Sequence, residues 1–347
     1  MHRAGLLALH RPLALVFAPL LFVQGLTGSV LLFRVSLARL IDPAGMTAQG
    51  VAPPAPVSTL LASAGARFPG ARVTRLFLPQ TPRDTVFANL SMPDGSARYA
   101  SLEPGSGKVL AAGSVWRFPL EAALQIHYRL MGARTGMAVI LANGLALALL
   151  AATGLGFWWP GKQRIGKSLA IGRSVPARLQ LRQVHRSAGV VLSAILLFSA
   201  TTGVLLVAPD LAEANGGPAA TALPPRSTGA IDRAIAQAQA RFPQARLRDI
   251  RFPLADRLDI NFFAPERNPR TVHFVSVTIE DARVTTALSA SDNPVLWMKL
   301  LPLHTGDSFA LPGKIALLAV ALALAFLATS GPVMWWQARK FRRKAQR

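Results

Sequence analysis

The 347-residue chain contains no cysteine. It therefore forms no disulfide, holds no iron–sulfur cluster on thiolates, and lacks the C-x-x-C-H sequence that attaches a c-type haem. Any haem in this protein must be bound without covalent links to the chain.

Acidic residues are also few, and long regions have none. All 16 Asp and Glu fall in two stretches, from Asp42 to Glu121 and from Asp210 to Asp307. Two basic segments contain no acid, and their Lys and Arg residues are Lys162, Arg164, Lys167, Arg173, Arg178, Arg182 and Arg186 in the first, and Arg339, Lys340, Arg342, Arg343, Lys344 and Arg347 in the second. Positive charge in short loops and at chain ends is typical of the cytoplasmic side of a membrane protein. We therefore expect both termini and the 161–186 loop inside, and the two acid-containing stretches outside.

A net charge of +22 is of the size seen in nucleic-acid-binding proteins, but the positions of the basic residues argue against such a function. The excess charge lies where it sets membrane topology, with additional attraction to anionic lipid. We expect a lipid membrane as a partner and no nucleic acid.

Long apolar runs dominate the composition, which is 51% hydrophobic with a positive mean hydropathy. Four segments, each about 20 residues long, are sufficient to cross a hydrocarbon core. They cover residues 12–35, 137–159, 187–208 and 313–336. The first has an apolar run too long for a signal peptide and lacks an A-x-A-like cleavage site, so we expect it to be a retained anchor.

The predicted fold is a membrane protein with four transmembrane α-helices in two duplicated halves and two small extracytoplasmic α+β units. The boundaries are 1–36 for the first transmembrane helix, 37–126 for the first exported unit, 127–160 for the second helix, 161–184 for the basic loop, 185–208 for the third helix, 209–303 for the second exported unit, 304–337 for the fourth helix and 338–347 for the basic tail.

Each exported unit has one helical stretch followed by alternating, strand-like runs. In the first unit the helix is expected at 57–68 and the strands at 73–78, 85–92 and 97–102. In the second unit the helix is expected at 231–242 and the strands at 247–252, 258–263 and 271–279. Neither unit shows a convincing nucleophile, acid–base pair or phosphate-binding loop.

Four of the six histidines occupy matching places in the duplication. His10 and His185, 175 positions apart, open the two outward-running segments, and His127 and His304, 177 positions apart, precede the two inward-running segments. The predicted topology therefore places one pair near the cytoplasmic face and the other near the outer face. His2 is expected to be a solvated terminal residue and His273 a structural one.

Paired imidazoles without cysteine or carboxylate partners suit axial ligation of haem iron better than structural zinc, which requires four ligands. The dipole at a helix N-terminus is expected to keep the rings neutral and able to bind metal. Cations that could meet haem propionates are Arg11, Arg182 and Arg186 at the inner level, and Arg129, Arg134 and Lys299 at the outer level. The alternative is that all four histidines are interfacial residues with their polar tips among lipid headgroups.

Two smaller motifs repeat with the histidines. Thr27-Gly28 and Thr202-Gly203 match each other, as do Thr153-Gly154 and Ser330-Gly331. A helical rise of about 1.5 Å per residue places the first two at the depth of His127 and His304, and the other two near His10 and His185. The glycines leave room for a flat porphyrin, or alternatively for close helix packing. The tryptophan pairs at 158–159 and 335–336 are expected to be interfacial anchors.

The order of these motifs resembles the PepSY-associated transmembrane-helix family, which includes inner-membrane siderophore-iron reductases. The His-Arg start and Thr-Gly exit of the first and third helices match, as do the His…Gly…Thr-Gly…Trp-Trp-Pro run of the second helix and its counterpart in the fourth. The similarity covers nearly the whole chain and includes two exported PepSY-like units. It implies a bacterial inner-membrane protein with two b-type haems, ligated by His10, His185, His127 and His304.

The function implied is an oxidoreductase that passes electrons across the membrane to reduce the iron of a periplasmic ferric siderophore or other ferric chelate. Some relatives carry a fused flavodoxin-like domain, which this sequence does not contain, so the electron donor, cytoplasmic or quinone, is left open. Two alternatives stay open. The exported units could regulate or inhibit an envelope peptidase, or the protein could be a general haem b electron conduit linked to quinone.

The ferric substrate is expected over the outer haem, between residues 51–113 and 229–288. Seven arginines of these segments could attract an anionic chelate, and solvated surface charge is the alternative. They are Arg67, Arg72, Arg75, Arg241, Arg246, Arg248 and Arg251.

Overall fold

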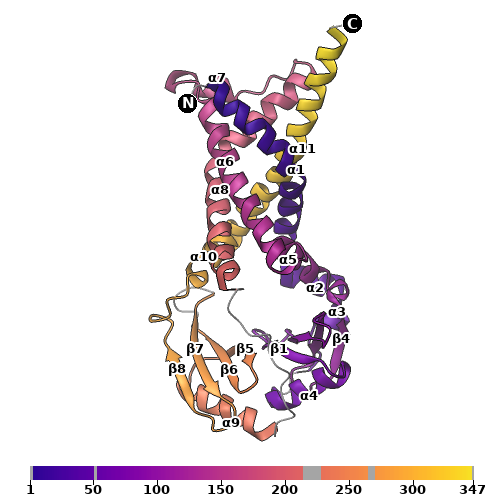
Figure 1. The fold of residues 1–347 in the computed structure, drawn as a ribbon, viewed down its shortest axis with the longest axis vertical. Coiled ribbons are helices and arrows are strands. Elements are labelled where there is room, and N and C mark those ends of the chain that lie inside the picture. The colour runs from indigo at the N-terminus through magenta and orange to yellow at the C-terminus, as the bar shows by residue number, and fades with distance from the viewer. Residues whose placement is uncertain (1–2, 51–52, 214–227, 265–269, 346–347) are drawn as a thin grey trace. The chain divides into compact units, whose positions relative to one another are not determined.

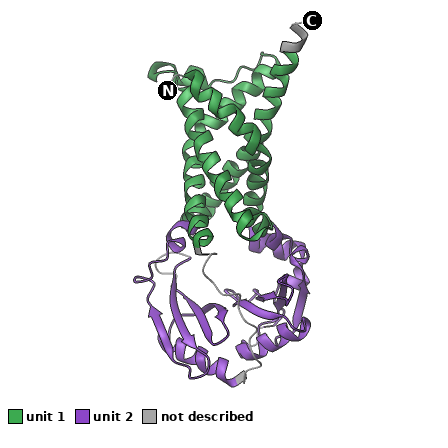
Figure 2. Ribbon diagram, viewed as in Figure 1, with its two compact units in different colours: residues 1–32, 123–214, 303–347 green, residues 33–122, 215–302 purple. Residues whose placement is uncertain are grey.

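The computed structural model describes residues 3–50, 53–213, 228–264 and 270–345. The chain divides into two compact units, which are drawn in separate colours in Figure 2. The first unit comprises residues 1–32, 123–214 and 303–347, and the second comprises 33–122 and 215–302.

The first unit is a bundle built on four long apolar helices. They are α1 (Arg3–Leu31), α6 (Ala133–Trp158), α8 (Ala177–Glu213) and α11 (Ala310–Ala345). Each is long and apolar enough to cross a membrane, as predicted from the four apolar segments. The helices form a ring, in which α1 packs on α6 and α11, and α8 packs on the same two neighbours. The predicted anchor segment is thus an integral member of the bundle.

Apolar side chains fill the middle of this bundle. Leu21 of α1, Leu150 of α6, Leu196 of α8 and Leu324 of α11 meet in one buried cluster. Short helices lie at both ends of the bundle (Figure 1). One end holds the start of α1, the end of α11 and the short helix α7 (Ile165–Leu169), and we call it the basic end because the two acid-free basic segments lie there. The opposite end holds α5 (Pro119–Arg129), and we call it the far end.

The second unit contains a single antiparallel sheet of eight strands in the order β4-β3-β2-β1-β5-β6-β7-β8. Its strands are β1 (Arg72–Phe77), β2 (Val86–Ser91), β3 (Ala97–Leu102), β4 (Val109–Gly113), β5 (Leu247–Leu254), β6 (Arg257–Phe263), β7 (Val272–Thr278) and β8 (Val284–Leu288). The six strands expected from alternating hydrophobicity are present. The edge strands β4 and β8 were not predicted, and the two units expected to be separate share one continuous sheet.

Two helices cover one face of this sheet. They are α4 (Val57–Arg67) and α9 (Thr228–Gln239), which fall where the sequence predicts them. Leu60 and Ala64 of α4 and Ala234 of α9 are fully buried in the core that the sheet forms with them. Further short α-helices among the described residues are α2 (Arg34–Ile41), α3 (Pro43–Met46) and α10 (Trp297–His304).

The centre of the sheet joins equivalent positions of the repeated sequence. Leu76 of β1 pairs with Ile250 of β5, and both side chains are fully buried. These residues are 174 positions apart, the same offset that relates residues 66–72 to 240–246. The two segments expected to flank a substrate therefore meet here as hydrogen-bonded strands.

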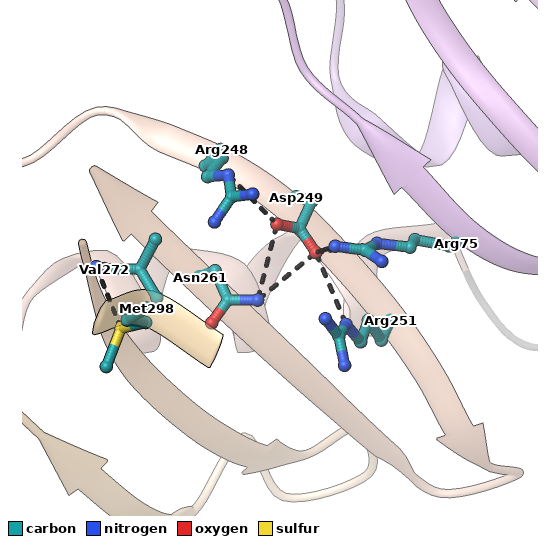
Figure 3. A network of polar contacts seen from close by, with 7 residues as sticks. All are labelled: Arg75, Arg248, Asp249, Arg251, Asn261, Val272 and Met298. Carbon is teal, nitrogen blue, oxygen red and sulfur yellow. Dashed lines mark hydrogen bonds and ion pairs between the residues drawn. The ribbon is translucent and has the colours of Figure 1, made fainter. Parts of the chain in front are cut away.

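Beside this central pair lies a fully buried carboxylate, Asp249 (Figure 3). Arg75 approaches Asp249 Oδ1 through Nε at 2.9 Å and Nη2 at 2.8 Å, and Asn261 donates to the same oxygen at 3.2 Å. Arg248 and Arg251 add longer ion pairs of 3.7 and 3.6 Å. Burial lowers the pKa of Arg75 to about 10, so Arg75 stays charged at neutral pH. The network ties β1 to β5.

We expect Asp249→Ala to destabilise the sheet by about 3–5 kcal/mol, because it leaves the partly buried Arg75 and Arg248 without the fully buried carboxylate that they pair with. Hydrogen–deuterium exchange of the full chain should show faster exchange in β1 and β5. Asp281→Ala is the matched control, since it removes an exposed ion pair with Arg283. Equal exchange in the two variants would contradict a structural role for Asp249.

Candidate functional site

The four repeated histidines lie in two pairs in the bundle. His10 lies in α1 and His185 in α8, both near the basic end. His10 is in the second turn of α1 and His185 is eight residues into α8, so neither sits at a helix start. Because the helix dipole acts only over the terminal turn, the prediction that it keeps these rings neutral is wrong.

His127 and His304 lie at the far end, in the last turns of α5 and α10. The dipole there would favour a charged ring, so the same prediction is wrong for this pair too. Burial instead lowers the pKa of His127 to about 3, with a smaller contribution from the neighbouring His304. Burial also lowers the pKa of His304. Both rings are therefore neutral at physiological pH and able to bind a metal.

A tight turn after each of these histidines leads into the next long helix. Leu130 and Met131 adopt positive φ angles of 47° and 60° between α5 and α6. At Gly136 a side chain would lie 1.7 Å from the carbonyl oxygen of Arg129, so only glycine fits. At Gly313 a Cβ atom would likewise lie only 2.6 Å from the carbonyl oxygen of Gly306. Glycine thus permits the close turns that hold both far-end histidines.

Each histidine ring contacts one of the repeated Thr-Gly or Ser-Gly motifs, which we call the hydroxyl–glycine pairs. Nδ1 lies within hydrogen-bond distance of the hydroxyl oxygen in all four cases: His10 with Thr153 at 3.0 Å, His127 with Thr27 at 2.9 Å, His185 with Ser330 at 2.7 Å, and His304 with Thr202 at 2.9 Å. The predicted depths of the motifs are confirmed, because each lies beside the histidine of its own level.

The adjacent glycines make room for the imidazoles. A Cβ at Gly28 would lie 3.3 Å from Cε1 of His127, and a Cβ at Gly203 would lie 3.3 Å from Cε1 of His304. At Gly154 and Gly331 the corresponding distances to the rings of His10 and His185 are 3.4 and 3.7 Å. The space next to these glycines therefore holds the histidine ring, a third use besides the porphyrin contact and the close helix packing considered from the sequence.

The far-end pair has the spacing of two ligands that share one metal. The ring centroids of His127 and His304 are 6.5 Å apart, and their planes are inclined by 54°. A metal midway between two imidazoles, with bonds of about 2.0–2.1 Å and roughly 1.1 Å from each nitrogen to its ring centre, would separate the ring centres by at most about 6.3 Å. The observed separation is close to this value. Since Nδ1 of each ring is engaged by a hydroxyl, Nε2 is the nitrogen that remains for a metal.

The basic-end pair lines a cavity of about 1200 Å³ inside the bundle. This volume slightly exceeds the usual range for small-molecule sites, about 300–1,000 Å³. His10 and His185 face it together with Gly154 and Gly331. Most of the wall is apolar, with Leu, Ala and Phe side chains from all four long helices. An apolar cavity with two imidazoles fits a large, flat, mainly apolar ligand with a central metal.

Charged and polar groups gather in the lining of the same cavity. Its arginines are Arg11, Arg178, Arg182, Arg186 and Arg339. Three of the lining residues also carry a buried atom that lacks a hydrogen-bond partner within the protein: Nε of Arg186, Nε1 of Trp158 and Oε1 of Gln337. Arginines suit the carboxylates of haem propionates, and the unpartnered atoms are of the kind that a bound ligand satisfies. The residues present therefore fit haem.

The other predicted residues have various surroundings. Arg129 lies over the ring of Tyr128, at 5.3 Å, with its Nε buried and unpartnered. His273, in β7, stacks on Phe242 at 4.2 Å and accepts a hydrogen bond from the Ala290 backbone at 3.0 Å, as a structural residue does. His2 lies outside the described residues.

The first member of each tryptophan pair, Trp158 or Trp335, lines the cavity. Trp159, Trp335 and Trp336 are exposed, as interfacial anchors are expected to be.

Most of the seven arginines predicted to attract a chelate have partners within the second unit. Arg75, Arg248 and Arg251 surround Asp249. Arg72 donates to the carbonyl oxygen of Phe252, and Arg246 to that of Gln80. These contacts favour a structural role over capture of an anionic chelate.

The model of the PepSY-associated TM region matches residues 7–338, which include all four bundle histidines and the whole sheet. The chain belongs to this family. A search of curated proteins found no match. As a PepSY-associated TM protein with four apolar helices, the chain is a multi-pass membrane protein.

Proposed function

We propose that this PepSY-associated TM protein is an inner-membrane oxidoreductase that binds two b-type haems and reduces the iron of a ferric siderophore or related chelate outside the membrane. The observation that carries the proposal is the arrangement of four imidazoles in two pairs, one at each end of the bundle, with each ring held at Nδ1. The 6.5 Å separation of the His127 and His304 rings supports shared ligation of one metal.

In this proposal His10 and His185 hold one haem, and His127 and His304 hold the other. When bound, haem b supplies reversible one-electron chemistry at each level. Arg11 and Arg186 meet propionates at the basic end, and Arg129 is assigned the same role at the far end. The apolar helices exclude water from the rings, and the hydroxyl–glycine pairs orient them.

The donor, a cytoplasmic protein or a quinol, would lie at the basic end and the substrate at the far end, with one histidine pair at each level to hold a haem between them. The ferric chelate accepts one electron and becomes ferrous, which weakens its hard-oxygen coordination and releases the metal for uptake. The charge distribution supports this orientation, since the acid-free basic segments are expected in the cytoplasm. The two duplicated halves each contribute one PepSY-like α+β unit, and the pairing of Leu76 with its equivalent Ile250 supports this origin.

The first test is the haem content of the purified protein. We expect about two b-type haems per chain in a pyridine haemochrome assay, fully released by denaturant, because there is no cysteine to attach them. After chemical reduction, addition of a ferric siderophore should reoxidise the protein and yield ferrous iron that a colorimetric chelator traps.

Protein made with ample haem supply but lacking haem would contradict the proposal and favour a membrane-anchored regulator of an envelope peptidase. Haem that reacts with quinones but not with any ferric chelate would favour a general electron conduit.

A further inference from the structure

The hydroxyl of each hydroxyl–glycine pair has a second hydrogen-bond contact besides its histidine. Thr27 donates to the Val23 carbonyl oxygen at 2.7 Å, Thr153 to that of Leu149 at 2.6 Å, and Thr202 to that of Phe198 at 2.9 Å. Ser330 lies 3.3 Å from the Leu327 carbonyl oxygen. These acceptors belong to the preceding turn of the same helix, which is a common arrangement for Ser and Thr within helices.

This second contact assigns the direction of the first. A hydroxyl has a single hydrogen, and a carbonyl oxygen can only accept. When the hydroxyl hydrogen points to the carbonyl, the hydroxyl oxygen can engage the imidazole only as an acceptor. Nδ1 must therefore carry the ring proton, and in a neutral imidazole Nε2 must then hold a free lone pair.

The adjacent glycine fixes the ring in the same orientation. At the far end, Thr27 holds Nδ1 of His127 while Gly28 packs against Cε1, the next atom of that ring. Thr202 and Gly203 hold His304 in the same way. One edge of each imidazole thus rests on a hydroxyl–glycine pair, and a bulkier residue at either glycine would push the ring away.

We propose that Thr27, Thr153, Thr202 and Ser330 are positioning residues that fix the four histidines as Nδ1–H tautomers with Nε2 ready to bind a metal. A partner that accepts a hydrogen bond from the ring N–H of a metal-binding histidine orients that ring and raises the basicity of its other nitrogen. The tautomer assignment stands on the contacts alone. Its consequence, control of haem affinity and potential, rests on the proposed function.

The tautomer is tested on the full-length protein in detergent, labelled with ¹⁵N-histidine and prepared without haem. We expect side-chain ¹⁵N shifts of an unprotonated Nε2 for His10, His127, His185 and His304. Thr27→Val should remove this preference at His127 alone, whereas Thr27→Ser should retain it. An unchanged His127 tautomer in Thr27→Val would overturn the proposal, and Thr202→Val with His304 provides an independent repeat if the first variant fails to fold.

The consequence is tested on the haem-loaded protein. Thr27→Val should weaken retention of the far-end haem by about 10–100-fold. It should also shift the potential of that haem upward, because a less basic imidazole stabilises the ferric state less. Thr27→Ser should restore both values.

Thr329→Val is the matched control, because Thr329 makes the same bonds to its own helix, next to Ser330, and is exposed. If Thr27→Val and Thr329→Val changed haem retention and potential equally, the effect would come from helix stability and not from the contact with His127. A wild-type protein without haem but with the expected tautomers would refute the proposed function and leave the tautomer assignment intact.

Discussion

Replacement of His304 by alanine is expected to remove one of the two haems and to leave the other with its spectrum and potential unchanged. His127→Ala should remove the same haem, because the two rings lie 6.5 Å apart and share one metal in the proposed arrangement. His10→Ala and His185→Ala should instead remove the second haem, whose expected site is the cavity that both residues line. Each variant should therefore lose about half of the haem, because it would take away one of the two histidines that would hold one of the two haems.

The measurement is a redox titration of each purified variant, followed in the visible spectrum. His273→Ala is the control, since that histidine lies in β7 of the second unit, stacked on Phe242. It should keep both haems. If His10→Ala and His127→Ala abolished the same spectral component, the pairing would be wrong.

The sequence is sufficient to locate the transmembrane helices and the four histidines. Apolar length alone predicts the helices, and the repeat singles out the histidines because the same residues return at nearly constant offsets. Thr27 and Thr202 are visible in that repeat as well. Their contact with His127 and His304 could not be predicted, since it depends on how the helices pack against one another.

Errors in the prediction of the second unit have a similar origin. β4 and β8 are short edge strands of five residues each, and their alternation is too brief to separate from turns. The pairing of β1 with β5 joins positions 174 residues apart, so nothing local signals a single sheet. The positive charge of Arg75 suggested a role in attracting an anionic chelate. Its carboxylate partner is instead Asp249, the residue that occupies the equivalent position in the repeat.

The second large effect concerns the side from which the protein can be oxidised. In vesicles, reduced protein should be reoxidised by a membrane-impermeant ferric chelate only when the face that carries residues 33–122 and 215–302 is accessible. The reason is topological, because the acid-free segments with Arg178, Arg182 and Arg339 are expected on the donor side. Protease cleavage of the basic tail reports the orientation of each preparation.

The far-end histidines provide the decisive variant in the same vesicles. His304→Ala should abolish reoxidation by the external chelate while the basic-end haem can still be reduced, because the last centre before the substrate is missing. Equal reoxidation in both orientations would refute an outward-facing reductase. Retained reoxidation in His304→Ala would show that the chelate takes its electron elsewhere. Loss of reoxidation confined to the far-end variants would locate the exit of the electron at His127 and His304, the pair that Thr27 and Thr202 hold in place.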